Sequence, residues 1–389
     1  MAVAKPSALR KEALGMLGLY LHIPFCDGKC PYCDFYSLAG DEALKETYTR
    51  SLERQLVFWA QKLIQKGVPP VADTLYFGGG TPNLLGAERI SSLIKIAKQN
   101  FSLENAEITV EVNPSSRLDA FLQTIFSAGA NRLSIGLQSA NDAELKILGR
   151  RHTARQAAET VQAARRAGFS NLSLDLMLAT PGQTMESALD SVKFCAELKV
   201  PHVSAYLLKV EPGTSYWNQR ESLSLPDEDE TADRYLAVCD ALEKVGLKQY
   251  EISNFSFSGK ESRHNLKYWH CEEYLGLGPG AHSFVNGKRF YYPRSLNGFL
   301  DKPEPIEDGE GGTLEEKIML GLRLREGITW ETLAGFGEEG RQAFSSMEKK
   351  SRMYRSAGLL VPEPARIAMT PKGFLVSNEL IAELLPETV

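Results

Sequence analysis

Short apolar stretches alternate with longer amphipathic stretches over the first half of the chain. The apolar stretches have the length and the β-branched and aromatic content of buried strands. They cover residues 19–25, 74–77, 108–112, 132–137, 172–178 and 203–210. The amphipathic stretches, such as 89–97 and 155–167, repeat their apolar positions with the period of a helix, and Gly168 follows the second as a C-cap. Six strand–helix alternations are therefore predicted.

This alternation predicts an α/β fold with a parallel sheet covered by helices, either an open doubly wound sheet or an incomplete barrel. In both architectures ligands bind at the C-terminal ends of the strands. Residues of types that bind ligands or react lie within or just after the predicted strands. They are Cys26, the glycine-rich segment 78–82, Glu111, Gln138 and Asp175. Because a polar residue inside an apolar strand is costly unless it has a partner, these positions are informative.

The C-terminal part of the chain differs in composition. A stretch rich in proline, glycine and acidic residues, 301–312, reads as a linker, and 313–389 predicts several helices and one hairpin over 359–367, as in a small winged-helix module. This segment carries 10 Lys and Arg against 11 Asp and Glu, so it lacks the positive surface that binds phosphates. We expect it to pack against the main domain or a protein partner.

Composition narrows the class of protein. With 389 residues, 43% apolar and 24% charged, the chain can bury a large core. A net charge of -5 gives no excess of positive charge to bind a phosphate backbone, so we expect no nucleic-acid partner. We find neither a membrane-spanning apolar run nor a secretory signal pattern at Met1, which predicts a cytoplasmic protein. Cys195 and Cys239 lie in helical patterns and read as small buried hydrophobes.

Three of the six cysteines, Cys26, Cys30 and Cys33, form a C-x3-C-x2-C motif. Thiolates this close can converge on one soft metal centre, and three of them leave one coordination position open. The alternatives are a zinc site completed by a distant His or Asp, or three unrelated buried cysteines. Structural zinc prefers paired cysteine spacings and four protein ligands, so the motif favours an iron–sulfur cluster with one open iron.

This motif, in a loop after a first strand, resembles that of the radical S-adenosylmethionine (radical SAM) superfamily. The resemblance implies a [4Fe-4S] cluster on Cys26, Cys30 and Cys33, with the amino acid end of SAM on the fourth iron. It also implies that Tyr32 lies next to SAM and that the glycine-rich loop holds the SAM amino group through Gly79, Gly80 and Thr81. Glycine suits such a loop because it lets backbone groups approach a ligand closely.

Four further residues would individually read as solvated or structurally paired polar groups. They are Glu111, Gln138, Arg150 and Asp175. Their order and positions match those of the SAM-contacting residues of the coproporphyrinogen oxidase branch, and Tyr20 matches a further SAM contact in that branch. The resemblance implies that the planar fork of Arg150 binds the SAM carboxylate. The other three would accept hydrogen bonds from the SAM amino group and ribose.

A second constellation covers residues 263–271, which include the sequence H-N-x-x-Y-W. It reads either as a loop whose aromatic residues pack on the barrel or as a haem site, because histidine, tyrosine and cysteine ligate haem iron and flat aromatic rings suit a porphyrin face. Four residues stay open as axial ligand: His264, Tyr268, His270 and Cys271.

Nearly the whole chain resembles the HemN/HemW branch, which contains oxygen-independent coproporphyrinogen III oxidases and HemW-type haem chaperones. The oxidase pattern has a fourth cysteine where this chain has Phe35, and the oxidases carry a longer segment before the first cysteine than the 25 residues here. The HemW-type signature H-N-x-x-Y-W is intact. Its haem contacts would be His264, Asn265, Tyr268 and Trp269.

The resemblance thus implies a haem chaperone that delivers haem to an acceptor such as a membrane respiratory enzyme. It also implies a homodimer and peripheral membrane association through that acceptor. The alternative is the oxidase, which decarboxylates two propionates, and an enzymatic role stays open. The implied fold is an incomplete parallel (β/α)6 barrel with a small, mainly helical, winged-helix-like C-terminal domain. The expected parts are a radical SAM core at 1–245, a barrel extension with the haem motif at 246–300, a linker at 301–312 and a HemN-type domain at 313–389.

Overall fold

A curved sheet dominates the computed structural model, which describes residues 16–115 and 118–386. Its central strands run in the order β1 to β6, and each pairs in parallel with the next. They are β1 (Leu17–Ile23), β2 (Ala72–Gly79), β3 (Glu107–Val112), β4 (Arg132–Gln138), β5 (Asn171–Leu178) and β6 (His202–Leu207). The six predicted strands are therefore confirmed, although β6 ends three residues before the predicted run does.

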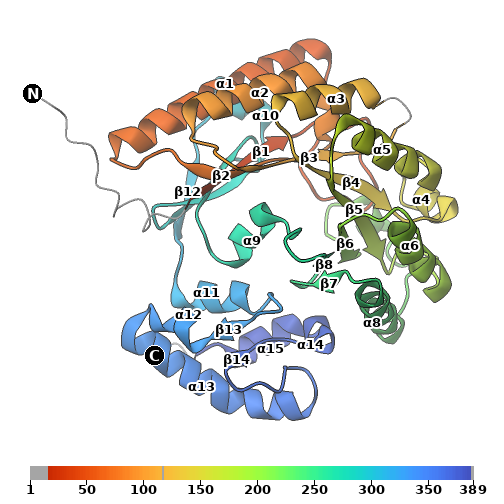
Figure 1. Ribbon diagram of the computed structural model, residues 1–389, viewed down its shortest axis with the longest axis vertical. Helices are drawn as coiled ribbons and strands as arrows, with labels where there is room; N and C mark the ends of the chain where they lie inside the picture. Colours follow the sequence, from red (N-terminus) through yellow and green to blue (C-terminus); the bar gives the residue numbers. More distant parts are fainter. Residues whose placement is uncertain (1–15, 116–117, 387–389) are drawn as a thin grey trace, which may run out of the picture.

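Helices cover the convex face of this sheet (Figure 1). They are α1 (Glu42–Gln65), α2 (Ala87–Asn100), α3 (Asp119–Ala128), α4 (Asp142–Ile147), α5 (Ala154–Ala167), α6 (Met185–Glu197) and α8 (Glu228–Lys244). Local sequence sets their ends. Helix α5 begins with a capping box between Thr153 and Gln156 and ends at Gly168, whose φ of 112° suits glycine. The predicted helices at 89–97 and 155–167 are confirmed.

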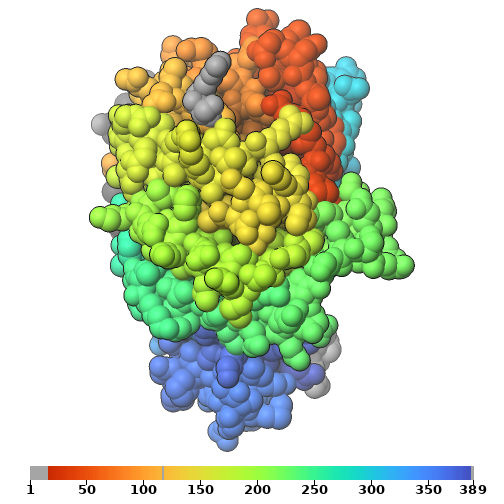
Figure 2. All heavy atoms as spheres, turned by 90° about the vertical axis from the view of Figure 1, so that its right-hand side faces the viewer, coloured from red at the N-terminus to blue at the C-terminus, as the bar shows by residue number. Residues whose placement is uncertain are grey.

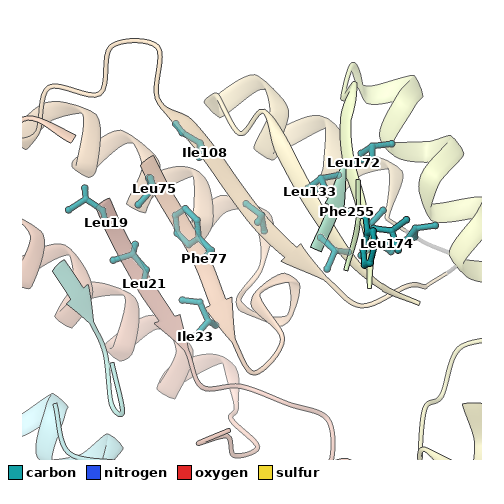
Figure 3. Close-up of a cluster of buried hydrophobic side chains, with 14 of the residues drawn as sticks. Leu19, Leu21, Ile23, Leu75, Phe77, Ile108, Leu133, Leu172, Leu174 and Phe255 are labelled. Carbon is teal, nitrogen blue, oxygen red and sulfur yellow. The ribbon is translucent and has the colours of Figure 1, made fainter. Parts of the chain in front are cut away.

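The main core lies between the sheet and these helices. Alternate residues of each strand point toward the helices, and their apolar side chains are buried, as Leu19, Leu75, Ile108, Leu133 and Leu172 illustrate (Figure 3). Cys195 and Cys239 lie in this core, as predicted. The other residues of each strand face the concave side. Many of these are polar, so the concave side, and not the apolar core, can bind a polar ligand.

Further strands extend both edges of the sheet. Strand β9 (Tyr274–Leu277) pairs in parallel with β1, and β10 (His282–Val285), β11 (Lys288–Tyr291) and β12 (Ile306–Glu310) follow antiparallel. At the other edge β8 (Asn254–Ser256) and β7 (Lys248–Gln249) follow β6. In the described part of the chain the edge strands β12 and β7 do not pair with each other, so the barrel is incomplete, as predicted.

The domain boundaries at 245, 300 and 312 stay predictions, but one detail of the expected linker differs. Residues 306–310 form the edge strand β12, which pairs with β11. Backbone pairing at an open sheet edge overrides the weak strand propensity of this acidic, glycine-containing stretch. The helix before it, α10 (Leu296–Asp301), packs on α1.

The C-terminal domain forms a lobe at one end of the molecule (Figure 2). Its elements follow a winged-helix order: α11 (Leu314–Gly321), β13 (Ile328–Thr329), α12 (Trp330–Ala334), α13 (Gly337–Ser356), β14 (Arg366–Ile367), α14 (Pro371–Leu375) and α15 (Ser377–Leu384). The hairpin predicted at 359–367 is reduced to a bridge between Leu360 and Met369, because Ile367 pairs with Ile328 instead.

This domain packs directly on the barrel, which confirms one of the two contacts expected for it. The backbone of Glu251 bridges to that of Leu324, and Arg325 N donates to the carbonyl of Tyr250 at 3.0 Å. Among the residues that the structure describes, no helix has the length and apolar character of a membrane span.

Candidate functional site

One cavity of about 880 Å³ opens at the C-terminal ends of the parallel strands and continues into the barrel. Such a volume is typical of sites for small organic ligands. It brings together most of the predicted site residues, which are Cys26, Cys30, Tyr32, Cys33, Gly79, Gly80, Thr81, Glu111, Gln138, Arg150, Asp175 and Asn265. Tyr20, His264, Tyr268 and Trp269 are not on its wall.

The cysteine loop is fixed at both ends. Cys26 N donates to the carbonyl of Leu38 at 3.0 Å, and Leu38 N donates to the carbonyl of Pro24 at 2.8 Å. The short helix α7 (Ser215–Gln219) also supports the loop, since Tyr216 N donates to the carbonyl of Pro31 at 2.9 Å. None of the three cysteines forms a disulfide within the described chain, and all three are partly exposed and line the cavity. The loop therefore presents its thiols without needing them for the core.

Hydrogen-bond donors lie next to the sulfur atoms. Thr81 Oγ1 is 3.4 Å from Cys26 Sγ, and Arg150 Nη1 donates to Cys30 Sγ at 3.7 Å. Three soft thiol donors with neighbouring donors and one side open to a cavity fit a [4Fe-4S] cluster with a free iron. Among the described residues, no three His, Cys, Asp or Glu side chains are grouped to hold a single metal ion.

The loop after β2 approaches the cysteines so closely that only glycine fits. A Cβ on Gly80 would lie 2.8 Å from the Phe25 carbonyl oxygen, 2.9 Å from that of Ile23 and 3.1 Å from Cys26 Sγ. Gly79 has a φ of 111°, and its N–H donates to Glu111 at 3.3 Å. The loop then continues into a 3-10 turn, Pro82–Leu85. Gly80 and Thr81 are thus held against the cysteine loop, and the contacts of Gly79, Gly80 and Thr81 with the SAM amino group stay predictions.

Arg150 is oriented by a residue that the sequence analysis missed. Its Nη2 donates to Asn113 Oδ1 at 2.6 Å and to the Gly136 carbonyl at 3.2 Å, while Asn113 Nδ2 donates to Thr81 Oγ1 at 2.9 Å. Asn113 therefore links the guanidinium to the glycine-rich loop. Its signal was present, because Asn113 directly follows the strand that carries Glu111.

Replacing Arg150 with lysine is expected to weaken SAM binding by roughly tenfold or more, because lysine cannot make the two parallel hydrogen bonds that a guanidinium makes to a carboxylate. Calorimetric titration with SAM measures this. The matched control is Arg155→Lys, at an exposed arginine that pairs with Glu159 on α5 and does not line the cavity. Equal SAM affinity for the Arg150 variant and the control would remove Arg150 from the SAM site.

Two carboxyl groups lie deeper in the cavity. Burial raises the pKa of Glu111 to about 7, against the hydrogen bond that Tyr76 donates to it at 2.8 Å. Burial also raises the pKa of Asp175, although Ser134 donates to it at 2.9 Å. Buried carboxylates of this kind are stabilised by a cationic ligand, and the ammonium and sulfonium groups of SAM supply such charges.

Gln138 occupies an unusual backbone position at the end of β4. Its φ is 69°, which a residue with a side chain rarely adopts, and the register of β4 against β5 shifts just before it. The strained bulge turns Gln138 to the cavity wall. Backbone strain of this kind is concentrated at functional sites.

Tyr20 lies outside the cavity wall in this structure. Its hydroxyl is 3.1 Å from His22 Nδ1, and its ring stacks with that of His264 at 6.3 Å between centroids. The SAM contact predicted for it stays a prediction.

The H-N-x-x-Y-W sequence forms helix α9 (Arg263–Trp269), which lies inside the concave side of the sheet (Figure 1). His264 is 1% exposed. Its Nδ1 lies 2.7 Å from Thr74 Oγ1, its Nε2 lies 2.7 Å from Tyr268 Oη, and its ring stacks on Tyr76 at 5.0 Å. Both ring nitrogens are therefore engaged within the protein, and α9 closes the end of the barrel opposite the cysteines.

The other axial candidates have different surroundings. Tyr268 is engaged with His264, whereas His270 contacts Glu326 at 2.9 Å and Glu272 at 3.6 Å. Cys271 is partly exposed, with a φ of 52°. Of the four predicted haem contacts, only Asn265 reaches the cavity wall.

The buried imidazole of His264 predicts a pH dependence of stability. Burial, followed by the nearby charges of Lys267 and Arg132, lowers its pKa to about 3. Between pH 6.5 and 3 the unfolded chain binds a proton that the folded chain does not, so this contribution to stability is full above pH 6.5 and is lost as the pH falls. Glu111 and Glu251, each with a pKa of about 7, change stability in the opposite direction.

A difference between variants isolates the histidine. The loss of stability in His264→Ala is expected to be about 2.5 kcal/mol smaller at pH 4.5 than at pH 7. Urea denaturation of both proteins at the two pH values measures it. A loss that is equal at both would show that His264 titrates normally in the folded chain.

Comparison with known proteins identifies the class first. The radical SAM superfamily profile matches residues 20–195, and the HemN C-terminal domain profile matches residues 313–376. The solved structure of coproporphyrinogen III oxidase (HemN) from Escherichia coli superposes with a TM-score of 0.79 at 22% identity, over 95% of this chain and 90% of that one. The fold and the cysteine loop define a radical SAM core with a HemN-type C-terminal domain.

Curated relatives narrow the class. This chain is 36% identical to heme chaperone HemW from Lactococcus lactis, over 95% of this chain and 97% of that protein. It is 34% identical to heme chaperone HemW from Bacillus subtilis, over 96% of this chain and 100% of that protein. It also shares 35% identity with the mitochondrial radical S-adenosyl methionine domain-containing protein 1 of Danio rerio, over 80% of this chain and 74% of that protein. The chain belongs to the HemW family of radical SAM proteins, which confirms the predicted branch.

Proposed function

We propose that this chain is a haem chaperone, which binds haem and delivers it to acceptor haemoproteins. The observation that carries the proposal is the similarity, over nearly the whole length of both chains, to curated proteins named heme chaperone HemW. The cavity supports it, since its wall joins the cysteine loop to Asn265 of the H-N-x-x-Y-W helix. Haem would thus bind within reach of the SAM-site residues.

The radical SAM family implies a [4Fe-4S] cluster and SAM. We propose that Cys26, Cys30 and Cys33 hold the cluster, which when bound can supply an electron to SAM. The residues proposed to position SAM are Tyr20, Tyr32, Gly79, Gly80, Thr81, Glu111, Gln138, Arg150 and Asp175. Asn113 orients Arg150, and Tyr76 and Ser134 orient the two carboxylates. These residues bind and orient a ligand that carries a carboxylate and positive charge.

The second candidate function is coproporphyrinogen III oxidation, favoured by the structural likeness to the Escherichia coli oxidase, which at 22% identity concerns the fold. Phe35 argues against it. Phe35 is 64% exposed beside the cavity, where the oxidase pattern has its fourth cysteine. An aromatic ring there cannot ligate iron or take up a proton.

The finer parts of the proposal rest on the family resemblance. They are haem contacts at His264, Asn265, Tyr268 and Trp269, an acceptor such as a membrane respiratory enzyme, a cytoplasmic location and a homodimer. Because both nitrogens of His264 are engaged in this structure, iron ligation by His264 would require it to exchange Thr74 or Tyr268 for iron.

Transfer can be tested directly. Anaerobically reconstituted protein loaded with haemin, mixed with an acceptor apoprotein from a respiratory complex, is expected to lose its haem absorbance as the acceptor gains activity. Free haemin at the same concentration is the control. Haem that stays on this chain while free haemin activates the acceptor would contradict the chaperone proposal.

A further inference from the structure

Arg132 at the start of β4 is a buried cation with unused hydrogen-bond donors. It is 1% exposed, lines the cavity, and its Nε and Nη1 have no protein partner among residues 16–115 and 118–386. A buried guanidinium is costly unless acceptors pair with its donors. Arg132 is not among the residues proposed to position SAM or to contact haem.

Two neighbours of Arg132 also have a buried polar atom without a hydrogen-bond partner in the described chain. In the sheet register Thr109 of β3 and Asn171 of β5 lie on either side of Arg132. Thr109 Oγ1 and Asn171 Oδ1 are buried and, within the described chain, lack a hydrogen-bond partner. The three side chains belong to the same concave face as Glu111 and Asp175, because strand residues two apart point the same way. One row across three strands therefore presents unsatisfied polar groups together.

This row lies toward the N-terminal ends of the strands: Thr109 is two residues before Glu111, and Arg132 is two residues before Ser134, which donates to Asp175. Arg132 is six residues before Gln138 on β4, which corresponds to roughly 20 Å at the usual rise of a strand. It lies instead near α9, since Glu107 of the adjacent strand accepts a hydrogen bond from the backbone N–H of His264 at 3.2 Å. Arg132 therefore belongs to the end of the barrel closed by the H-N-x-x-Y-W helix.

The charges around Arg132 set the class of ligand. Burial lowers the pKa of Arg132, but Glu107, Tyr76, Tyr250 and Asp175 raise it, and its pKa lies above the usual value. Glu107 accepts a hydrogen bond from the backbone of α9 and, within the described chain, none from Arg132 Nε or Nη1. The unpartnered Nε and Nη1 do not share an edge of the guanidinium, so each can donate a separate hydrogen bond to an anionic oxygen, and the Thr109 hydroxyl can add a donor.

We propose that Arg132, with the neighbouring hydroxyl of Thr109, forms a subsite for a carboxylate of the molecule bound in the barrel. This rests on the proposed function, in which the carboxylate is a haem propionate. The subsite fixes the orientation of the macrocycle by holding a propionate at the α9 end of the cavity, while the cysteine loop and Arg150 lie at the other end. Arg150 and Arg132 thus serve two different carboxylates.

Haemin and haemin dimethyl ester, whose propionates are esterified, distinguish this subsite from binding in general. The wild-type chain is expected to prefer haemin by about tenfold or more, and Arg132→Met to lose that preference. Asn171→Asp should also lose it, because the new carboxylate beside Arg132 occupies the guanidinium. Arg166→Met removes an exposed arginine paired with Asp119 on the outer helices and is the matched control. SAM titration of each variant verifies that the barrel is folded.

The outcomes separate the two proposals. Failure of the wild-type chain to bind haemin would overturn both the haem chaperone and the subsite. Equal wild-type affinity for haemin and its diester would overturn the subsite alone. If Arg132→Met does not fold, Asn171→Asp decides, because it supplies the missing partner of Arg132 and is expected to keep or raise the thermal midpoint. A preference for haemin that Asn171→Asp leaves unchanged would also overturn the subsite.

Discussion

Replacing Cys26 with serine is expected to remove nearly all iron and inorganic sulfide from anaerobically reconstituted protein. The remaining thiols, Cys30 and Cys33, cannot hold a cluster whose other ligands are SAM and a weakly binding hydroxyl. The fold should persist, because Cys26 is partly exposed and its sulfur contacts mainly Thr81. We expect a free energy of unfolding of the apoprotein within about 1 kcal/mol of wild type. Iron and sulfide analysis, with chemical denaturation, measures both effects.

Cys271→Ser is the matched control for this prediction. Cys271 is also a free, partly exposed cysteine, but it lies outside the cavity wall near Glu316. The control should retain the full iron content. Full iron in Cys26→Ser, or equal loss in both variants, would show that the C-x3-C-x2-C loop does not hold the cluster.

Replacing His264 with alanine is expected to lower the free energy of unfolding by about 3–5 kcal/mol. The variant loses a buried ring stacked on Tyr76 and leaves the hydroxyls of Thr74 and Tyr268 without their partner. Urea denaturation at pH 7 measures the loss. A change below about 1 kcal/mol would mean that His264 is not packed as described.

This prediction affects how haem-binding results are interpreted. Weaker haem binding by His264→Ala would not by itself identify an iron ligand, because the substitution also disrupts the packing of α9 inside the barrel. Tyr268→Phe is the sharper variant, since it keeps the histidine ring and frees Nε2 at a cost of about 1 kcal/mol. If His264 ligates haem, this variant should bind haemin at least as tightly as wild type and show an unchanged iron spectrum. Reduced binding with an altered spectrum would favour Tyr268 as the ligand.

The parallel sheet could be predicted because its signals are local. Apolar strands alternate with helices whose caps are written in the sequence, such as Thr153 and Gly168 around α5. The cysteine loop was equally accessible, because its three cysteines lie within eight residues. A barrel extension was expected at 246–300, but its individual strands and β12 were not predicted, since such short strands depend on pairing with distant segments and not on their own composition.

The site was predictable only in part, for the same reason. Glu111 and Asp175 stand out as acidic residues inside apolar strands, whereas Asn113 acquires its role only when the fold brings Arg150 and Thr81 to it. The burial of His264 was also not evident, because its partner Thr74 is 190 positions away. Only the three-dimensional register reveals that Thr109, Arg132 and Asn171 form one row.

The most direct test of the central claim, that this radical SAM chain is a haem carrier, compares two assays on one anaerobically reconstituted preparation. The first titrates haemin and follows the Soret band. The second supplies coproporphyrinogen III, SAM and an electron donor and follows protoporphyrinogen IX. We predict stoichiometric haemin binding and no turnover of coproporphyrinogen. Turnover to protoporphyrinogen IX without saturable haemin binding would contradict the claim and establish the oxidase instead.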